Sequence, residues 1–269
     1  MIFTLQRKLR TTHRLNNRMI KETVFEINRA FKKKYTLYYL LSLAALVILA
    51  NTAVVAFRLI YGENEGTFAY NLLEYATWCF VIPYYSCIFI ADIVYGKGLT
   101  ELKDNNSFIK MYITKLIASI VLAAVFLIAA FAFLIGVTAL FQISDGGLSG
   151  YMILGFTRKM VLAIPSWFAG VCFAIMCLFV FSRKKIAFIV FFVITLVIPR
   201  IVMFFAAEPF RIAAFRFLRK YTITQNISLI PYPADPARSV PLTIALGIIY
   251  GLIACVIGIT VTKKKLVQK

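Results

Sequence analysis

The side chains that could do chemistry in this chain are few and scattered. His13 is the only histidine among 269 residues, and it lies in a basic stretch far from any cluster of carboxylates. Catalysis of the Ser/His/Asp or Cys/His kind needs a histidine beside its nucleophile, and an HExxH zinc hydrolase needs two histidines. An intramembrane aspartyl mechanism needs two carboxylates within apolar segments, where only Asp92 is available. The sequence therefore predicts that the chain is not an enzyme.

The cysteines form neither a disulfide pattern nor a metal pattern. Their number is odd, each lies inside an apolar stretch, and no pair has CxxC spacing. We expect small buried side chains at Cys79, Cys87, Cys172, Cys177 and Cys255.

The composition indicates which class of protein the chain belongs to. Hydrophobic residues make up 61% of the sequence and charged residues 15%, with a mean hydropathy of +0.84. Soluble domains carry about 45–50% apolar and roughly 25% charged residues. These values exclude a soluble enzyme, a disordered protein and a disulfide-stapled secreted module, and they predict a polytopic membrane protein.

Six apolar stretches are long enough to cross a bilayer, whose hydrocarbon core of about 30 Å needs roughly 20 residues of helix. We therefore predict an all-α fold with six transmembrane helices. Pro199 and Arg200 interrupt the fifth stretch, and we expect Glu208 to lie close enough to pair with Arg200. The approximate spans are Leu37–Phe57, Ala76–Val94, Ile113–Phe141, Met160–Phe181, Ile186–Phe205 and Leu242–Val261.

The charge of the chain is strongly positive and unevenly distributed. Lys and Arg number 30 against 11 Asp and Glu, a net charge of +19. The basic residues form clusters between apolar stretches, which favours anionic membrane lipids as partners and argues against nucleic acid. The lead-in, the second and fourth connections and the tail hold 10, 4, 3 and 4 of them. This bias predicts that both termini are cytoplasmic, with a basic lead-in at 1–35, a six-span domain at 36–262 and a basic tail at 263–269.

The last part of the lead-in, Arg18–Lys34, has the spacing of an amphipathic helix. Ile20, Val24, Ile27 and Phe31 fall on one helical stripe, and charged residues cover the other faces. Such a helix lies along the inner leaflet with its apolar side in the acyl boundary. Two roles stay open: a lipid-surface anchor, or a lever between a cytosolic partner and the first span.

The connection after the second span predicts a short cytoplasmic helix. Gly96 and Gly98 can end the preceding helix and turn the chain, and Leu99–Lys103 can form a helical turn or two. The two asparagines that follow break this element, and Ser107 is a good N-cap for the next helix.

This pattern resembles the ABC-2 type permeases, the membrane subunits of bacterial ABC exporters. The resemblance covers the six-span layout, the amphipathic lead-in and an acidic, Gly-rich and Ser-plus-basic series around the second connection. One departure is that Phe108 and Ile109 stand where the family often has an arginine directly after the serine. The matching positions are Asp92, Gly96, Gly98, Ser107, Lys110 and Lys115.

The resemblance implies a subunit that works with other chains in a bacterial cell membrane. A second permease, identical or related, completes the translocation path, and separate ATP-binding subunits dock beneath it. ATP and Mg²⁺ are then held by the partner, because Gly96-Lys97-Gly98 lacks the upstream glycine of a Walker A motif, and this chain has no cofactor. The coupling helix received by the ATPase comprises Gly98, Leu99, Thr100, Glu101, Leu102, Lys103 and Asp104.

The connection Ala206–Pro241 interleaves aromatic and basic residues on the predicted outer side. It is either an interfacial helix pair whose basic side chains reach lipid phosphates, or an extracellular gate that the cargo passes. The candidate gate residues are Phe210, Arg211, Phe215, Arg216 and Arg219. Family habit and the scarcity of polar residues in the spans point to amphipathic or hydrophobic cargo, such as a peptide. The alternative is a non-transporting scaffold or sensor.

Gly247 and Gly251 form a GxxxG pattern in the last span, and Gly258 follows further along the chain. Small residues let helices approach closely. We therefore expect this face to pack against another span.

Overall fold

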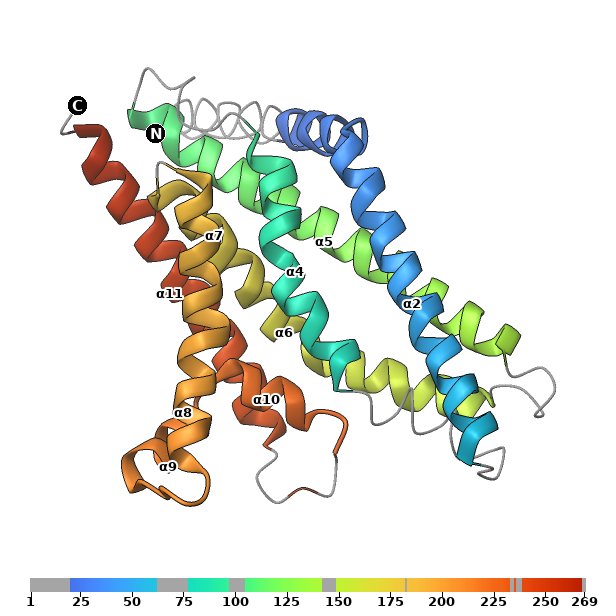
Figure 1. The fold of residues 1–269 in the computed structure, drawn as a ribbon. Helices are drawn as coiled ribbons and strands as arrows, with labels where there is room; N and C mark the ends of the chain where they lie inside the picture. Colours follow the sequence, from blue (N-terminus) through green and yellow to red (C-terminus); the bar gives the residue numbers. More distant parts are fainter. Residues whose placement is uncertain are drawn as a thin grey trace, which may run out of the picture.

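A computed structural model of the chain describes residues 20–61, 77–96, 105–141, 149–181, 183–232, 235 and 239–267. Within these residues all regular structure is helical, with no strand. The prediction of an all-α fold is confirmed for this part of the chain. Most of the long helices run between two opposite ends of the molecule (Figure 1).

Six segments of the described chain are long and apolar enough to cross a membrane, as the hydropathy of the sequence predicts. Five are single helices and one is interrupted, so that α7, a π-helical turn η3 and α8 together make the fifth. The segments are α2 (Lys34–Tyr61), α4 (Trp78–Tyr95), α5 (Asn105–Phe141), α6 (Gly150–Val180), α7 (Lys184–Phe192) with η3 (Val193–Val197) and α8 (Ile198–Ala206), and α11 (Val240–Val267).

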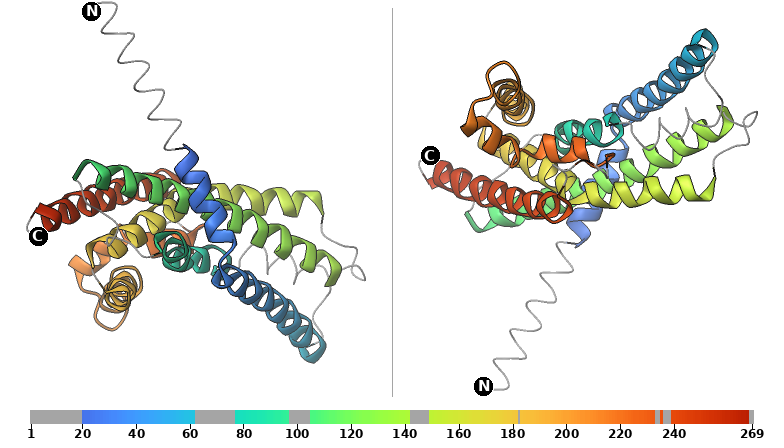
Figure 2. Two further views of the ribbon diagram at one scale, coloured as in Figure 1. Left: turned by 90° about the horizontal axis from the view of Figure 1, so that it is seen from above. Right: turned by 90° about the horizontal axis from the view of Figure 1, so that it is seen from below.

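The helix α6 is the centre of the bundle. It packs most extensively against α11 and also against α4, whereas α2 contacts α5 and diverges from the remaining helices (Figures 1 and 2). Glycines make the approach of α11 possible. A β-carbon added at Gly247 would lie 2.6 Å from the carbonyl oxygen of Pro165, and one at Gly251 would lie 2.6 Å from the Phe168 ring. The expected packing face is therefore confirmed, and its partner Pro165–Phe168 belongs to α6 of the same chain.

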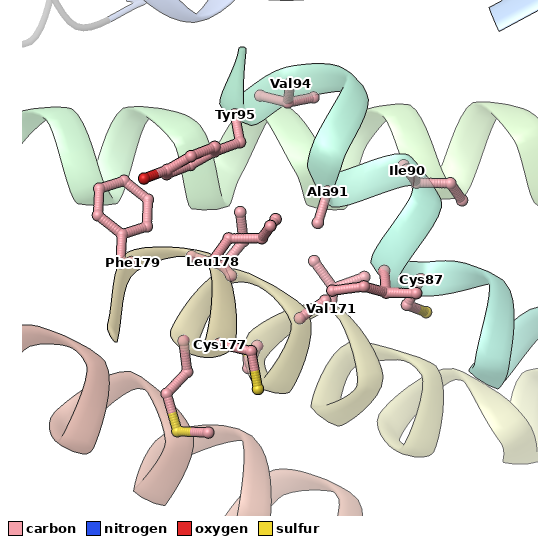
Figure 3. Close-up of a cluster of buried hydrophobic side chains, with 14 of the residues drawn as sticks. Cys87, Ile90, Ala91, Val94, Tyr95, Val171, Cys177, Leu178 and Phe179 are labelled. Atoms are coloured by element: carbon pink, nitrogen blue, oxygen red, sulfur yellow. The ribbon is translucent and has the colours of Figure 1, made fainter. Parts of the chain in front are cut away.

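Two clusters of buried apolar side chains hold the helices together. One lies where α4, α5 and α6 meet, and includes Tyr95 and Phe179, whose rings are edge to face at 5.0 Å (Figure 3). The other surrounds Trp167 of α6, whose indole N–H donates to the carbonyl of Phe80 on α4 at 2.8 Å. The five cysteines are free, and four of them are buried.

The fifth span is irregular where its proline falls. Pro199 has no N–H to donate to the carbonyl four residues earlier, so the regular hydrogen-bond pattern of an α-helix cannot continue through it. The chain widens into the π-helical turn η3 directly before Pro199, which lies near the start of α8. Thr195 in this turn bonds the carbonyl of Phe191 at 2.7 Å through its hydroxyl. Such wide turns are typical of helices adapted to a function.

A further helix at residues 20–31 lies across one end of the bundle (Figure 1). The same end holds the C-terminal ends of α4, α6 and α11 and the N-terminal ends of α5 and α7. We call it the basic end, because the described lysines and arginines of residues 21–34, 183–185 and 263–264 lie there. The opposite end, the far end, carries two short helices, α9 (Ala213–Arg219) and α10 (Ile223–Leu229).

Candidate functional site at the basic end

The C-terminal end of α4 is closed by lysines from two other segments. The last carbonyls of a helix have no partner within it, and α4 ends at Gly96, whose positive φ of 64° turns the chain away. Lys115 of α5 donates to the carbonyl of Val94 at 2.8 Å. Lys33, in the turn before α2, donates to the carbonyl of Ile93. Cations at this position also match the negative end of the helix dipole.

Two carboxylates complete this arrangement. Lys115 pairs with Glu26 of the helix 20–31 at 2.8 Å, and both side chains are largely buried, 8% and 16% exposed. Asp92 on α4 pairs with Lys184 at the start of α7 at 2.6 Å, closer to solvent. These five side chains, Glu26, Lys33, Asp92, Lys115 and Lys184, are here called the capping cluster. It joins the helix 20–31, the start of α2, α4, α5 and α7.

The capping cluster has an excess of positive charge. Once Lys115 has paired with Glu26 and Lys184 with Asp92, Lys33 remains without a carboxylate of its own. The pKa of Lys33 is lowered, first by burial and then by repulsion from Arg29, Lys115 and Lys184, with Asp92 acting in the opposite direction.

The helix 20–31 contacts the bundle mainly through residues outside the predicted apolar stripe. Thr23 and Ala30 are buried, and Ile27 packs against the core. Ile20, Val24 and Phe31 of the predicted stripe are 46–59% exposed, although the ring of Phe31 meets that of Phe126 at 6.0 Å. The prediction of a helix is confirmed, but its apolar stripe is divided between the bundle and the surroundings, because Glu26 must reach Lys115.

The coupling residues expected from the resemblance, Gly98–Asp104, lie outside the described residues. The chain on both sides is described. The described chain stops at Gly96, directly after α4 and next to the capping cluster. It resumes at Asn105, where α5 begins. A helix capped by Ser107 would begin at residue 108, whereas α5 begins three residues earlier, so the predicted cap position was wrong. The short helix that the asparagines were expected to end lies outside the described residues. Asparagine is itself favourable at a helix start.

The sequence singles out Asp92 and Lys115 but indicates no partner for either. In the structure Asp92 pairs with Lys184, and Lys115 pairs with Glu26. Glu26 and Lys33 were missed as capping residues. Their only signal was their place at the edge of an apolar segment, since a pairing across 60 or more residues leaves no local pattern.

The far end carries the candidate gate residues. No residue of α9 is buried, and the helix is held by aromatic contacts: the ring of Phe205 lies 5.4 Å from Phe210 and 5.1 Å from Phe215. Arg211 pairs with Glu208, which corrects the expected pairing of Glu208 with Arg200. Arg216 and Arg219 lie in the last turn of α9. The candidate gate residues therefore belong to one exposed unit.

A pair of short helices was one of the two predictions for this connection, but the second of them, α10, is buried in the bundle and not interfacial. It is wedged among α4, α6, α11 and η3, with Ile223–Ile227 buried. Asn226 donates to the carbonyls of Lys220 at 2.8 Å and Thr222 at 2.9 Å, and it accepts from Thr243 of α11 at 3.4 Å. A cavity of about 350 Å³ lies between α10 and the irregular fifth span, with Tyr84, Thr195 and Tyr250 in its wall.

In the described part of the chain, no three His, Cys, Asp or Glu side chains gather as metal ligands would. Comparison of the sequence with protein-family models and with curated proteins found no match. The fold and the capping cluster together define an all-helical protein with six helices suited to cross a membrane.

Proposed function

We propose that the chain is a permease subunit of a bacterial ABC exporter, with the cytoplasm at the basic end. The observation that carries the proposal is the capping cluster, because it ties both ends of the undescribed connection 97–104 to three other segments. A push on that connection would be passed to α4 and α5 directly, and through Lys184 to α7.

The helix 20–31 fits the role of a second input. Glu26 binds it to Lys115, and Lys33 binds the chain directly after it to α4. A cytosolic partner that displaced this helix would have to break a largely buried ion pair, so the helix and the bundle should move together. This favours the lever over the simple anchor.

The route of motion to the far end also has a structural basis. The fifth span begins at Lys184, which is bonded to α4, and continues through η3 and Pro199 to the exposed unit of α9. A helix interrupted in this way can bend where its hydrogen bonds are irregular. The proposed gate therefore lies at the end of a span whose hydrogen bonding is irregular in the middle. Cargo would be amphipathic or hydrophobic, such as a peptide, moved by a pair of such subunits.

The proposal is tested by the recovery of an ATPase. Tagged full-length chain is purified from its own host membrane, and ATP hydrolysis in the eluate is measured. The variant Glu101→Ala/Leu102→Ala should reach the membrane in normal amounts but lose most of the associated ATPase activity. The matched control, Glu208→Ala/Leu218→Ala, removes the same residue types at the far end and should retain it.

A non-transporting scaffold or sensor is the competing function. It predicts that no ATPase is recovered with the wild-type chain, and that the two double variants behave alike. Either result would overturn the exporter proposal.

A further inference from the structure

Within the part of the chain that the structure describes, two cations at the basic end form no ion pair with a carboxylate. Arg29 lies in the last turn of the helix 20–31, and Lys33 follows it four residues later in the turn before α2. The two repel each other, and Lys115 and Lys184 add to the repulsion. Glu26 and Asp92 are occupied by Lys115 and Lys184. Among the described residues, Arg29 has no acidic partner.

The donors of this pair are not exhausted. A lysine ammonium has three N–H groups and an arginine guanidinium five. Lys33 donates one to the carbonyl of Ile93, and its side chain is only partly buried. An anion placed between Arg29 and Lys33 would accept from both and would cancel their repulsion. A phosphate diester, singly charged and rich in acceptor oxygens, suits this geometry.

A large exposed apolar side chain lies beside the pair. Phe25 lies one helical turn before Arg29 and is 65% exposed, whereas the exposed Ile20 and Val24 lie towards the opposite side of the same short helix. These side chains stand at the end of six apolar segments, where the surface of a bilayer would lie. A soluble anion would leave Phe25 in water, whereas the acyl chains of a lipid would cover it.

We propose that Arg29 and Lys33 form a binding site for the phosphate of an anionic phospholipid, whose acyl chains cover Phe25. The site needs only that the six segments cross a bilayer, and it holds whether or not the chain is a transporter subunit. The lipid binds at the turn that joins the helix 20–31 to α2 and to α4.

The test is native mass spectrometry of the full chain in neutral detergent, titrated with phosphatidylglycerol or with phosphatidylcholine. The wild type should bind one phosphatidylglycerol with clear preference. Each variant, Arg29→Gln and Lys33→Gln, should weaken that binding about fivefold, since a cation near anionic lipid contributes about 1 kcal/mol. The control Lys263→Gln/Lys264→Gln removes two exposed cations at the same end, on α11, and should change the preference less than twofold.

Three results would overturn the site. Equal binding of both lipids by the wild type would show no anion selectivity, and equal weakening in the control would show a general charge effect. Displacement of the bound lipid by millimolar inorganic phosphate would show a soluble-anion site. Circular dichroism of each variant checks that it is folded, and Arg29→Gln, which breaks no observed ion pair, keeps the test valid if Lys33→Gln is unstable.

Discussion

At the scale of single residues, Lys115 occupies an unusual position for a lysine. It is buried, carries a charge, and binds both Glu26 and the carbonyl of Val94. A buried charge is tolerated only when it is paired and hydrogen-bonded. The capping cluster therefore owes its geometry to this side chain, while Lys33 and Lys184 act nearer to solvent.

We expect Lys115→Met to destabilise the fold strongly. The substitution keeps the length of the side chain but leaves Glu26 buried without a partner, which costs about 3–5 kcal/mol. Thermal unfolding in detergent should show a large fall in Tm, and Glu26→Gln/Lys115→Met should recover part of it. The exposed residue Lys110 on the same helix provides the control, since Lys110→Met should change stability by less than about 0.5 kcal/mol. Equal effects at the two positions would contradict the role of Lys115.

Replacing glycine with alanine should change the stability of the fold in opposite directions at two positions. A β-carbon at Gly247 would lie 2.6 Å from the backbone oxygen of Pro165, whereas at Gly155 nothing lies within 4 Å. Gly247→Ala must therefore push α11 away from α6 and should lower the Tm. Gly155→Ala, in the interior of α6, should stabilise the helix by about 0.5–1 kcal/mol. Two shifts of the same sign would show that the α6–α11 contact is looser than the structure has it.

At the scale of elements, the spans followed from the sequence and the far end did not. Hydropathy predicts the six long segments because a helix must be apolar along its whole length to lie in lipid. A helix pair was predicted for this connection, but not that α10 would be buried, because its buried residues include the polar Thr224, Gln225 and Asn226. Its position is determined by tertiary hydrogen bonds, such as that of Thr243 to Asn226, which no local pattern records. The same holds for the pairing of Asp92 with Lys184.

The helix α10 should depend on Asn226. Asn226→Leu removes the amide that satisfies the carbonyls of Lys220 and Thr222, and leaving such buried groups unpaired costs about 1–3 kcal/mol. We expect α10 to detach more often, so that trypsin cuts after Lys220 several-fold faster than in the wild type. Ser228→Ala removes only a local bond to the carbonyl of Gln225 and should leave the cutting rate unchanged. Equal cutting rates in the wild type and Asn226→Leu would show that this amide does not hold α10 in place.

The turn between the helix 20–31 and α2 should respond to pH through Lys33. Its pKa is lowered from the ordinary value of 10.5 by burial and by neighbouring cations. Between the lowered and the ordinary pKa, the unfolded chain binds more protons than the folded one, so stability rises with pH in that window. Below this pH window Lys33 is charged in both the folded and the unfolded state, and its unfavourable surroundings lower the stability of the fold by a constant amount.

This dependence is measured as the difference in Tm between Lys33→Gln and the wild type. The variant lacks the charged lysine, so the Tm of the wild type relative to that of the variant should rise as the pH rises from neutral towards 10.5. A bound anionic lipid would raise the pKa of Lys33 and flatten the trend. A difference that stays constant over the whole pH range in lipid-free detergent would contradict the lowered pKa.

At the scale of the whole molecule, both ends of the described chain lie at the basic end (Figure 1). The helix 20–31 crosses that end, and α11 extends to Val267, so the first residues of the expected basic tail are helical. Six crossings return the chain to its starting side, and the excess of lysine and arginine there predicts a cytoplasmic location. Reporter fusions check this: a fluorescent protein after Lys269 should fold and fluoresce, and alkaline phosphatase inserted between residues 142 and 148 should be active. The reverse pattern would place the capping cluster and the connection 97–104 outside the cell, away from any ATPase, and would remove the physical basis of the exporter proposal.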